Sequence, residues 1–267
     1  SYSINKNNDS YSSSIYKYKK IIPPRDRFWA DPFVIKKDSM YYIYFEEVLF
    51  ENNKGRICYI ELNKQGKISD SKIALETDFH LSYPFIIEDQ NQLYMIPETM
   101  ENNTIELYKC TNFPNKWELA HVMMEDVQAV DSTIFKYKGK YWMFTNLRSH
   151  SNFSINEELH LFFSESLHGE WISHPLNPII SDIRNSRPAG NIIEVDGKIY
   201  RPSQDSSIRY GHSININEII KISEFEYQEE TVEHILPKWS KEIYGVHTIN
   251  SDKDMTVIDC LTRRRKL

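Results

Sequence analysis

Apolar and polar residues follow the same order at four places along the chain. In each place an apolar run is followed by a short polar turn and then by a second run rich in aromatic residues. The four copies cover residues 31–46, 83–98, 131–146 and 189–204, and their turns read Asp-Ser, Gln-Asn, Lys-Gly and Asp-Gly. Two apolar runs joined by such a turn are typical of a β-hairpin. A weaker fifth copy covers residues 246–260.

The copies recur at nearly constant spacing. They begin at residues 31, 83, 131, 189 and about 246, which separates them by 52, 48, 58 and about 57 residues. Common propeller repeats are slightly shorter, at ~40–50 residues. Further apolar segments between the hairpins, such as 55–62, 104–109 and 159–163, supply the remaining strands. We therefore predict an all-β fold, a five-bladed β-propeller, because the alternative of two stacked β-sandwiches does not explain the constant spacing.

This prediction treats residues 1–267 as a single propeller domain. The blades would start near residues 28, 80, 128, 186 and 244. Residues 1–22 would form an N-terminal arm, in which residues 17–22 could be a strand that completes the last blade and closes the ring.

Composition narrows the class of protein. The chain has 32 Lys and Arg against 38 Asp and Glu, for a net charge of −6, so it lacks the positive field that draws nucleic acids and no nucleic-acid partner is expected. No apolar run approaches the ~20 residues of a membrane-spanning helix, so no transmembrane segment is expected. The three cysteines lie far apart and favour a reducing, cytoplasmic setting over a disulfide framework. Tyr, Phe and Trp number 17, 13 and 5, which suits strands and flat sugar-binding faces.

The predicted topology gathers polar residues around one mouth. In a propeller the first strand of each blade starts at one face and the second strand returns to it, so the openers and the enders of each hairpin surround the same opening. The openers are Asp31, Tyr83, Asp131, Ala189 and His247 or its neighbour, and the enders are Glu46, Glu98, Asn146 and Gln204. Carboxyl groups gathered in this way lose hydration and repel one another, which separates their pKa values as acid–base chemistry requires. For any single Asp, a turn or strand cap is the alternative.

Basic residues collect around the fourth hairpin. Arg187 precedes it, and the string that follows contains Arg201, Asp205, Arg209 and Tyr210. Guanidinium groups match phosphate and carboxylate oxygens, so this string predicts an anion pocket. The alternative is that these arginines neutralise the carboxylates of the mouth.

The other chemical signals are weaker. His80 lies just before the second hairpin and Trp29 just before Asp31, so both are expected near the mouth. Nine histidines without tight spacing do not predict a zinc site, and no residue is assigned as a metal ligand. We assign no cofactor, although a Ca²⁺ or Na⁺ ion in the channel is left open because carboxylates and water suit hard cations.

Two sets of motifs resemble known families. The string 28–33, Phe-Trp-Ala-Asp-Pro-Phe, together with residues 41–46 resembles the first blade of the five-bladed glycosidases of glycoside hydrolase family 43 and their furanosidase relatives. Strings spread over nearly the whole chain resemble the propeller domain at the N-terminus of plant glucosamine inositolphosphorylceramide transferase and in bacterial surface-polysaccharide loci. They are residues 80–85, 95–99, 130–135, 187–190, 201–205, 209–211 and 247–250.

The resemblance to the glycosidases implies roles for the carboxylates. It makes Asp31 the base that activates water and Asp131 the carboxylate that tunes the acid and orients the sugar. The general acid of that family is a Glu that opens the fourth blade, where this chain reads Arg187-Pro-Ala-Gly and has no carboxylate. Glu98 or Glu46 could take its place. Losing the acid while gaining arginines fits a substrate with a good leaving group, such as a glycosyl phosphate or a nucleotide sugar.

Two functions follow as hypotheses. The first is an enzyme that cleaves or transfers a glycosyl unit in cell-surface polysaccharide metabolism, with Asp31, Asp131 and Glu98 as its catalytic residues. The second is a non-catalytic carbohydrate-binding propeller that serves a partner glycosyltransferase, which the missing acid favours. The predicted substrate-binding residues are Trp29, Glu46, His80, Tyr83, Asn146, Arg187, Arg201, Gln204, Asp205, Arg209, Tyr210 and His247.

Overall fold

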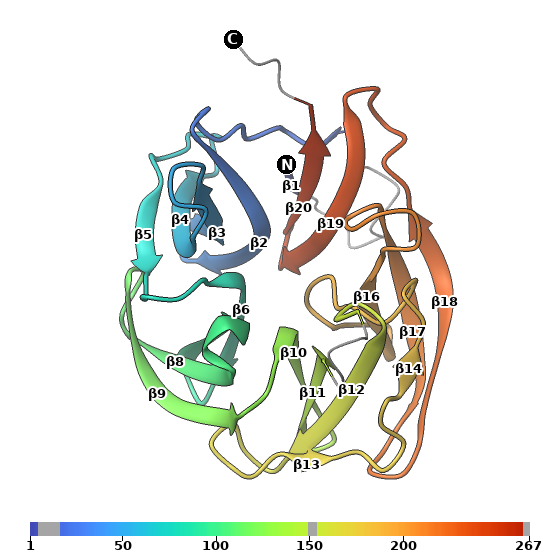
Figure 1. Cartoon of the computed structure of the whole chain (residues 1–267). Helices are drawn as coiled ribbons and strands as arrows, with labels where there is room; N and C mark the ends of the chain where they lie inside the picture. Colours follow the sequence, from blue (N-terminus) through green and yellow to red (C-terminus); the bar gives the residue numbers. More distant parts are fainter. Residues whose placement is uncertain (5–16, 149–153, 264–267) are drawn as a thin grey trace.

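A computed structural model of the chain describes residues 1–4, 17–148 and 154–263. The strands of these residues form antiparallel sheets that surround a central axis, as in a β-propeller (Figure 1). The five predicted hairpins are present, each as two paired neighbouring strands. The predicted all-β propeller is therefore confirmed.

Each of the first four sheets is built from consecutive strands. The first contains β2 (Arg27–Lys37), β3 (Met40–Leu49), β4 (Gly55–Asn63) and β5 (Lys72–Leu75). The second contains β6 (Ser82–Asp89), β7 (Gln92–Thr99), β8 (Thr104–Asn112) and β9 (Lys116–Glu125), with the 3-10 helix η2 (Met100–Asn102) after β7. The third contains β10 (Ala129–Tyr137), β11 (Lys140–Leu147), β12 (Glu158–Ser164), β13 (Ile172–Ser173) and β14 (Ile180–Ser181). The fourth contains β15 (Ile193–Val195), β16 (Lys198–Asp205), β17 (Ser213–Ile222) and β18 (Tyr227–Ile235).

The last sheet differs from the other four, and the prediction of five complete blades is wrong in this respect. It contains three strands, β19 (Ile243–Asp252), β20 (Met255–Thr262) and β1 (Tyr2–Ile4). The N-terminal strand pairs with β20 and is only three residues long. Beyond it, the described part of the chain adds one isolated bridge, between Tyr2 and Lys19, where a strand over residues 17–22 was predicted. Four sheets thus have at least the four strands of a full blade, and this one has three.

Aromatic side chains fill the wedges between neighbouring sheets. Phe33 of β2 meets Tyr83 of β6 edge to face, with 5.0 Å between ring centroids, and lies 6.0 Å from Phe85. All three are buried, together with Ile134 of β10 in the same cluster. Large rings in edge-to-face contact fill such spaces well, which explains the high aromatic content of the chain.

Strand β2, and likewise β6 and β10, carries a β-bulge close to its start. The pairing register shifts between Ala30 and Phe33, and it shifts at the equivalent places in β6 and β10. Within these bulges Asp31, Tyr83 and Asp131 have φ angles of 51°, 41° and 52°. Left-handed backbone is unfavourable for residues with a Cβ, and bulges re-aim side chains. The three predicted openers are therefore turned out of the normal strand alternation.

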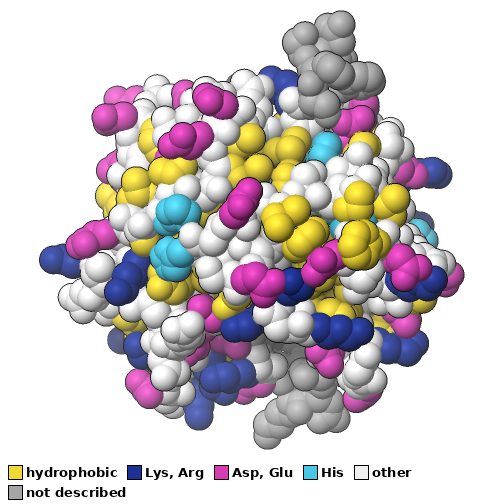
Figure 2. All heavy atoms as spheres, turned by 90° about the horizontal axis from the view of Figure 1, so that it is seen from below, with side chains coloured by type: hydrophobic (Ala, Val, Ile, Leu, Met, Phe, Trp, Pro, Cys, Tyr) yellow, Lys and Arg dark blue, Asp and Glu magenta, His cyan; other side chains and the backbone are white. Residues whose placement is uncertain are grey.

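The outer surface is mixed in character. Figure 2 shows acidic, basic and hydrophobic side chains interspersed over the side of the ring seen from below in Figure 1. Over the described ranges, no helix has the length and apolar character needed to cross a membrane.

Candidate functional site

A large open pocket of about 1420 Å³ lies at the mouth predicted from the repeat. Its wall includes the start of β2, the ends of β3, β7 and β20, and the loop between β16 and β17. Eight of the predicted site residues line it: Trp29, Asp31, Glu46, His80, Glu98, Arg187, Tyr210 and His247. Residues that are far apart in the sequence are thus brought to one opening.

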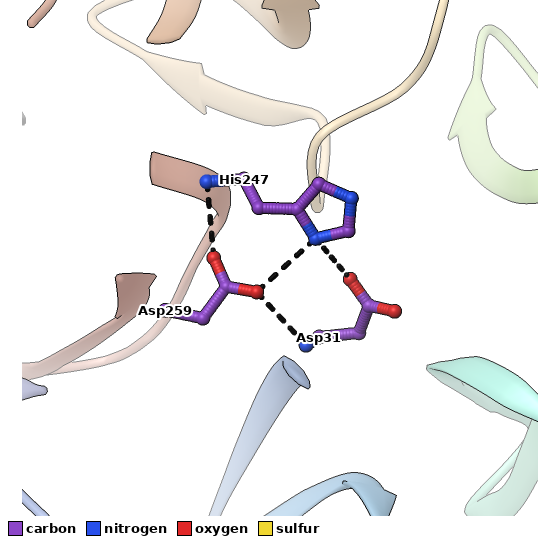
Figure 3. Close-up of side chains that lie close together, drawn as sticks. All are labelled: Asp31, His247 and Asp259. Atoms are coloured by element: carbon purple, nitrogen blue, oxygen red, sulfur yellow. Dashed lines mark hydrogen bonds and ion pairs between the residues drawn. The ribbon is translucent and has the colours of Figure 1, made fainter. Parts of the chain in front are cut away.

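Asp31, His247 and Asp259 form a compact cluster at one side of this pocket (Figure 3). Nδ1 of His247 lies 2.9 Å from Oδ1 of Asp31 and donates to Oδ2 of Asp259 at 3.1 Å. Oδ1 of Asp259 accepts from the backbone N–H groups of His247 and Thr248, at 3.0 and 2.8 Å, and its Oδ2 accepts from that of Asp31 at 3.1 Å. Asp259 therefore anchors both the imidazole and the bulge that carries Asp31.

The three groups of this cluster have different affinities for protons. Burial raises the pKa of Asp31 to about 6, although the neighbouring His247 opposes that rise. Burial lowers the pKa of His247, but Tyr210, Asp31 and Asp259 outweigh it and hold that pKa well above its usual value. The pKa of Asp259 is lowered, because His247 and two backbone N–H groups outweigh its burial. At neutral pH the cluster is an imidazolium between two carboxylates.

Arg187, Asp131 and Glu98 form a second cluster. Nε of Arg187 donates to Oδ2 of Asp131 at 2.5 Å, and Nη1 donates to Oδ1 of Asn156 at 2.8 Å. Nη2 of Arg187 lies 3.6 Å from Oε2 of Glu98. Gln204 donates from Nε2 to Asp131 at 2.9 Å. Of the two interpretations of the arginines, neutralisation of a mouth carboxylate therefore describes Arg187, which lines the pocket and binds Asp131 behind it.

Glu98 has a raised pKa with a cause partly different from that of Asp31. Burial raises the pKa of Glu98 well above its usual value, the charge of Asp131 adds to this, and Arg187 only partly opposes it. The side chain is 12% exposed. Glu98 therefore holds its proton to a higher pH than an ordinary Glu, and it lies in the same pocket as Asp31.

Tyr210 joins the two clusters. Its hydroxyl accepts a hydrogen bond from Nε2 of His247, and the guanidinium carbon of Arg187 lies 4.9 Å from the centroid of its ring. Tyr210 belongs to the loop between β16 and β17 and is 49% exposed. It forms part of the pocket wall while contacting both cationic groups.

His80, Glu46 and Trp29 form another part of the pocket wall. His80 accepts the backbone N–H of Gly55 at Nδ1 and lies 2.9 Å from Oε1 of Glu46 through Nε2. The contact with Glu46 raises the pKa of His80. Trp29 donates from Nε1 to Glu47 at 2.9 Å, which fixes its ring in the wall.

Several predicted residues lie behind the wall rather than in it. Tyr83 is buried, and its hydroxyl contacts Oγ1 of Thr133 and accepts the backbone N–H of Gly190, both at 2.8 Å. Asn146 is also buried and donates to the backbone carbonyl of Ile155 at 2.9 Å. These residues, like Asp131 and Gln204, lie behind the pocket wall and support it through buried hydrogen bonds.

Three predicted residues lie away from the pocket. Arg201 is 1% exposed and binds Glu229 of β18, with Nε and Nη2 both within 2.8 Å of its carboxylate. Asp205 accepts from the backbone and hydroxyl of Ser207, and so stabilises a turn. Arg209 is exposed on the loop before Tyr210 and does not line the pocket. The predicted anion-binding role of Arg201 is not supported, because its charge is already neutralised inside the fourth sheet.

Asp259 was not among the predicted residues. It lies in the second strand of the fifth hairpin, where the repeat is weakest. The next residue, Cys260, pairs with Val246. In the first hairpin the corresponding pair is Glu46 with Ala30. The sequence therefore carried a signal. When the fifth copy is aligned with the first, Asp259 comes one residue before the position that corresponds to Glu46.

In the described ranges, Asp31, His247 and Asp259 are the group of three whose donor atoms could hold a metal ion, being within 4.8 Å of one another. We assign no ion to this group, and the channel Ca²⁺ or Na⁺ stays a prediction.

The chain is similar to a family described as "Glucosamine inositolphosphorylceramide transferase 1, N-terminal", which matches residues 20–256. The glucosamine inositolphosphorylceramide transferases 1 of Oryza sativa subsp. japonica and Arabidopsis thaliana are each 33% identical to it, over 208 and 210 residues, or 77% of this chain. The chain spans only 28% and 27% of the length of these relatives. Both are plant proteins, so these relatives do not support the expected bacterial setting.

Solved structures of propeller enzymes resemble the fold. The catalytic domain of a Coprinopsis cinerea GH62 α-L-arabinofuranosidase covers 98% of this chain and 89% of its own, with a TM-score of 0.64 and 11% identity. A GH43 β-xylosidase/α-arabinofuranosidase from a compost metagenome covers 88% and 91%, with a TM-score of 0.59 and 13% identity. At such identities the likeness concerns the fold alone.

Proposed function

The chain belongs to the family of glucosamine inositolphosphorylceramide transferase N-terminal domains, and from this premise we propose that it is a carbohydrate-active domain. Its pocket binds a glycosyl unit and cleaves or transfers it in the metabolism of cell-surface glycans. The relatives are named as transferases, which supports glycosyl transfer as the reaction. This chain spans about a quarter of their length, so their whole activity is not assigned to it.

One observation carries the proposal: the pocket brings together the carboxyl groups of Asp31 and Glu98, which lie beside different cationic partners, His247 and Arg187. Asp31 has a pKa of about 6 and lies against the cationic His247, so it is ionised at neutral pH and is a better base than an ordinary Asp. Glu98 holds its proton to a higher pH than an ordinary Glu, because of its burial and the nearby charge of Asp131. Two carboxyl groups whose environments separate their pKa values can serve as base and acid. In this proposal Asp31 is the base or nucleophile, and Glu98 is the acid.

The remaining residues have supporting roles. Arg187 brings positive charge next to Glu98, and a cation there stabilises an oxygen that becomes negative as the glycosidic bond breaks. This suits a glycosyl phosphate or a nucleotide sugar. Asp131 orients Arg187 through the hydrogen bond at 2.5 Å, so it acts as a positioning residue.

The test is turnover by the purified chain. Nucleotide sugars, glycosyl phosphates and aryl glycosides are each offered, and released sugar and new glycosides are detected by mass spectrometry. Asp31→Asn and Glu98→Gln should each lower the rate by at least about a hundredfold, whereas Asp205→Asn, in a turn outside the pocket, should not. Unchanged rates in both pocket variants would contradict the assignment.

A second function is favoured by one observation. Arg187 occupies the start of the fourth blade, where the resembling glycosidases have their acid, and its Nε and Nη1 are hydrogen-bonded to Asp131 and Asn156. The alternative is a carbohydrate-binding propeller that presents a glycan to a partner glycosyltransferase. Calorimetric binding of an oligosaccharide that is recovered intact would support it. Under this alternative Glu98→Gln changes affinity but abolishes no reaction.

A further inference from the structure

One sector of the pocket rim is apolar and basic at the same time. We define the basic rim as residues 17–28 together with Phe50 and residues 261–263. It exposes four large hydrophobic side chains that line the outer pocket: Ile22, Phe28, Phe50 and Leu261, which are 73%, 39%, 59% and 54% exposed. The rings of Phe28 and Phe50 are neighbours, with centroids 6.3 Å apart. Scattered single hydrophobic residues are normal on a surface, but a group at one opening indicates a binding surface.

The fold explains why these residues meet. Strand β2 starts at Arg27, and its pairing partner β3 ends at Leu49, directly opposite. Strand β20, which ends at Thr262, packs against β2 and lies beside it in Figure 1. The start of one strand and the ends of two others therefore reach the same face. Residues 21–24, Ile-Ile-Pro-Pro, precede β2 outside any strand, and two prolines remove backbone donors that could pair there.

The charge of the rim is opposite to that of the whole chain. Residues 17–28 contain five basic residues and one acidic residue, Asp26, in a chain of net charge −6. Arg263 adds a further cation and lies over the ring of Tyr244. Part of the charge is neutralised locally, because Lys20 binds Glu242 at 2.9 Å. Arg27 binds Asp26 and the buried Glu47, and the exposed Glu51 lies next to Phe50 in the chain.

Arg25 is the clearest open cation of the rim. It is exposed, lines the outer pocket, and forms no ion pair with the described residues. It lies between Ile22 and Phe28, so an open positive charge is flanked by two exposed apolar side chains. Apolar and cationic side chains in one surface are what an interface with anionic lipid requires, because the former enter the acyl boundary and the latter meet the headgroups.

We propose that the basic rim docks onto the surface of an anionic lipid bilayer and turns the mouth of the pocket toward it. A nucleic acid would use the cations but would leave the four hydrophobic side chains exposed to water, so the observations favour lipid. The proposal concerns binding only and does not depend on whether the pocket catalyses a reaction.

The test is sedimentation of the whole chain with vesicles. Vesicles of phosphatidylcholine alone are compared with vesicles that also contain phosphatidylserine, at low and at high salt. We expect binding that requires phosphatidylserine and weakens with salt. Arg25→Glu should weaken it at least about fivefold, and the double variant Ile22→Ser with Phe28→Ser should weaken it more than about tenfold.

Matched variants separate docking from a general surface effect. Phe225 is 75% exposed on the turn between β17 and β18, and Phe225→Ser should leave vesicle binding unchanged; Lys116→Glu, at the exposed start of β9, is the control for charge. Thermal unfolding confirms that each variant is folded. The proposal is overturned if anionic vesicles do not bind the chain, or if the controls lose as much binding as the rim variants. It is also overturned if the rim variants abolish self-association in the centrifuge while vesicle binding persists, since the rim would then be an interface between two copies.

Discussion

Replacing Asp31 by Asn should make the protein more stable at neutral pH, although it removes a proposed catalytic group. Asp31 is 3% exposed, and the pKa of its carboxyl rises from an ordinary 3.8 to about 6. An acid whose pKa is raised by folding binds more protons in the native than in the unfolded state. The free energy of unfolding therefore falls as the pH rises from below 4 to above 6. Asn has no charge to bury and escapes this loss.

The magnitude follows from the two pKa values. The difference between 3.8 and about 6 corresponds to about 3 kcal/mol of unfolding free energy, which the wild type has lost at the upper end of this interval. At about pH 4.5 the wild type has already lost part of this unfolding free energy, because that pH lies above the ordinary pKa of 3.8. Between about pH 4.5 and about pH 8, the stability of Asp31→Asn relative to wild type should therefore rise by about 2 kcal/mol. Measuring the change with pH removes the constant effect of exchanging an oxygen for an amide nitrogen.

The assay is urea unfolding at a series of pH values, with Asp259→Asn as the matched control. Asp259 contacts the same imidazole, but its pKa is lowered. Its ionised form therefore stabilises the fold above the ordinary pKa, and this contribution disappears as the pH falls. Asp259→Asn should lose stability at neutral pH and recover part of it in acid, which is the opposite sign. If the stability difference for Asp31→Asn did not vary with pH, the argument that burial strains this carboxylate would be refuted.

Three further predictions concern other parts of the mouth. Glu98→Gln should flatten the fall of wild-type unfolding free energy above pH 4.5, because the pKa of Glu98 is raised by folding; urea titrations at several pH values measure this. Arg201→Met should lower the free energy of unfolding by about 3–5 kcal/mol, because it leaves Glu229 buried without its partner, while ligand affinity measured by calorimetry stays unchanged. Gly190→Ala should lower the free energy of unfolding by about 3 kcal/mol or more. The φ angle of Gly190 is 136°, and a Cβ there would lie 2.0 Å from the carbonyl oxygen of Ile249. A lower melting temperature would show this loss.

The fold and the position of the mouth could be predicted because they depend on periodicity. A hairpin repeat places its openers and enders by counting, and Asp31, Glu46 and Glu98 lie in the pocket where that count puts them. The blade count failed at the weakest copy. There the third strand comes from Tyr2–Ile4 at the other end of the chain, and a strand of three residues carries too little pattern to be recognised.

The partners of each side chain could not be predicted in the same way. Spacing says that Arg187 and Arg201 flank one hairpin, but not that one meets Asp131 from a neighbouring blade while the other faces Glu229 within its own sheet. Such contacts depend on bulges and loops, which turn a side chain independently of strand alternation. The role of Asp259 was missed for the same reason, since it depends on backbone N–H groups of Asp31, His247 and Thr248 at the register shifts of β2 and β19.

The strain at the mouth and its chemistry have a common cause. Asp31 and Asp131 combine a left-handed backbone with a buried carboxylate, and each feature alone lowers stability. Both are compensated by groups from other sheets: Asp259 and His247 hold Asp31, and Arg187 holds Asp131. A fold under selection for stability alone would replace such residues, because Asn or Gly accepts the same backbone without the charge. At this pocket, strained backbone and buried carboxylates occur together, and both are stabilised by groups from other sheets. This combination argues that these residues are retained for binding or catalysis rather than for the stability of the fold.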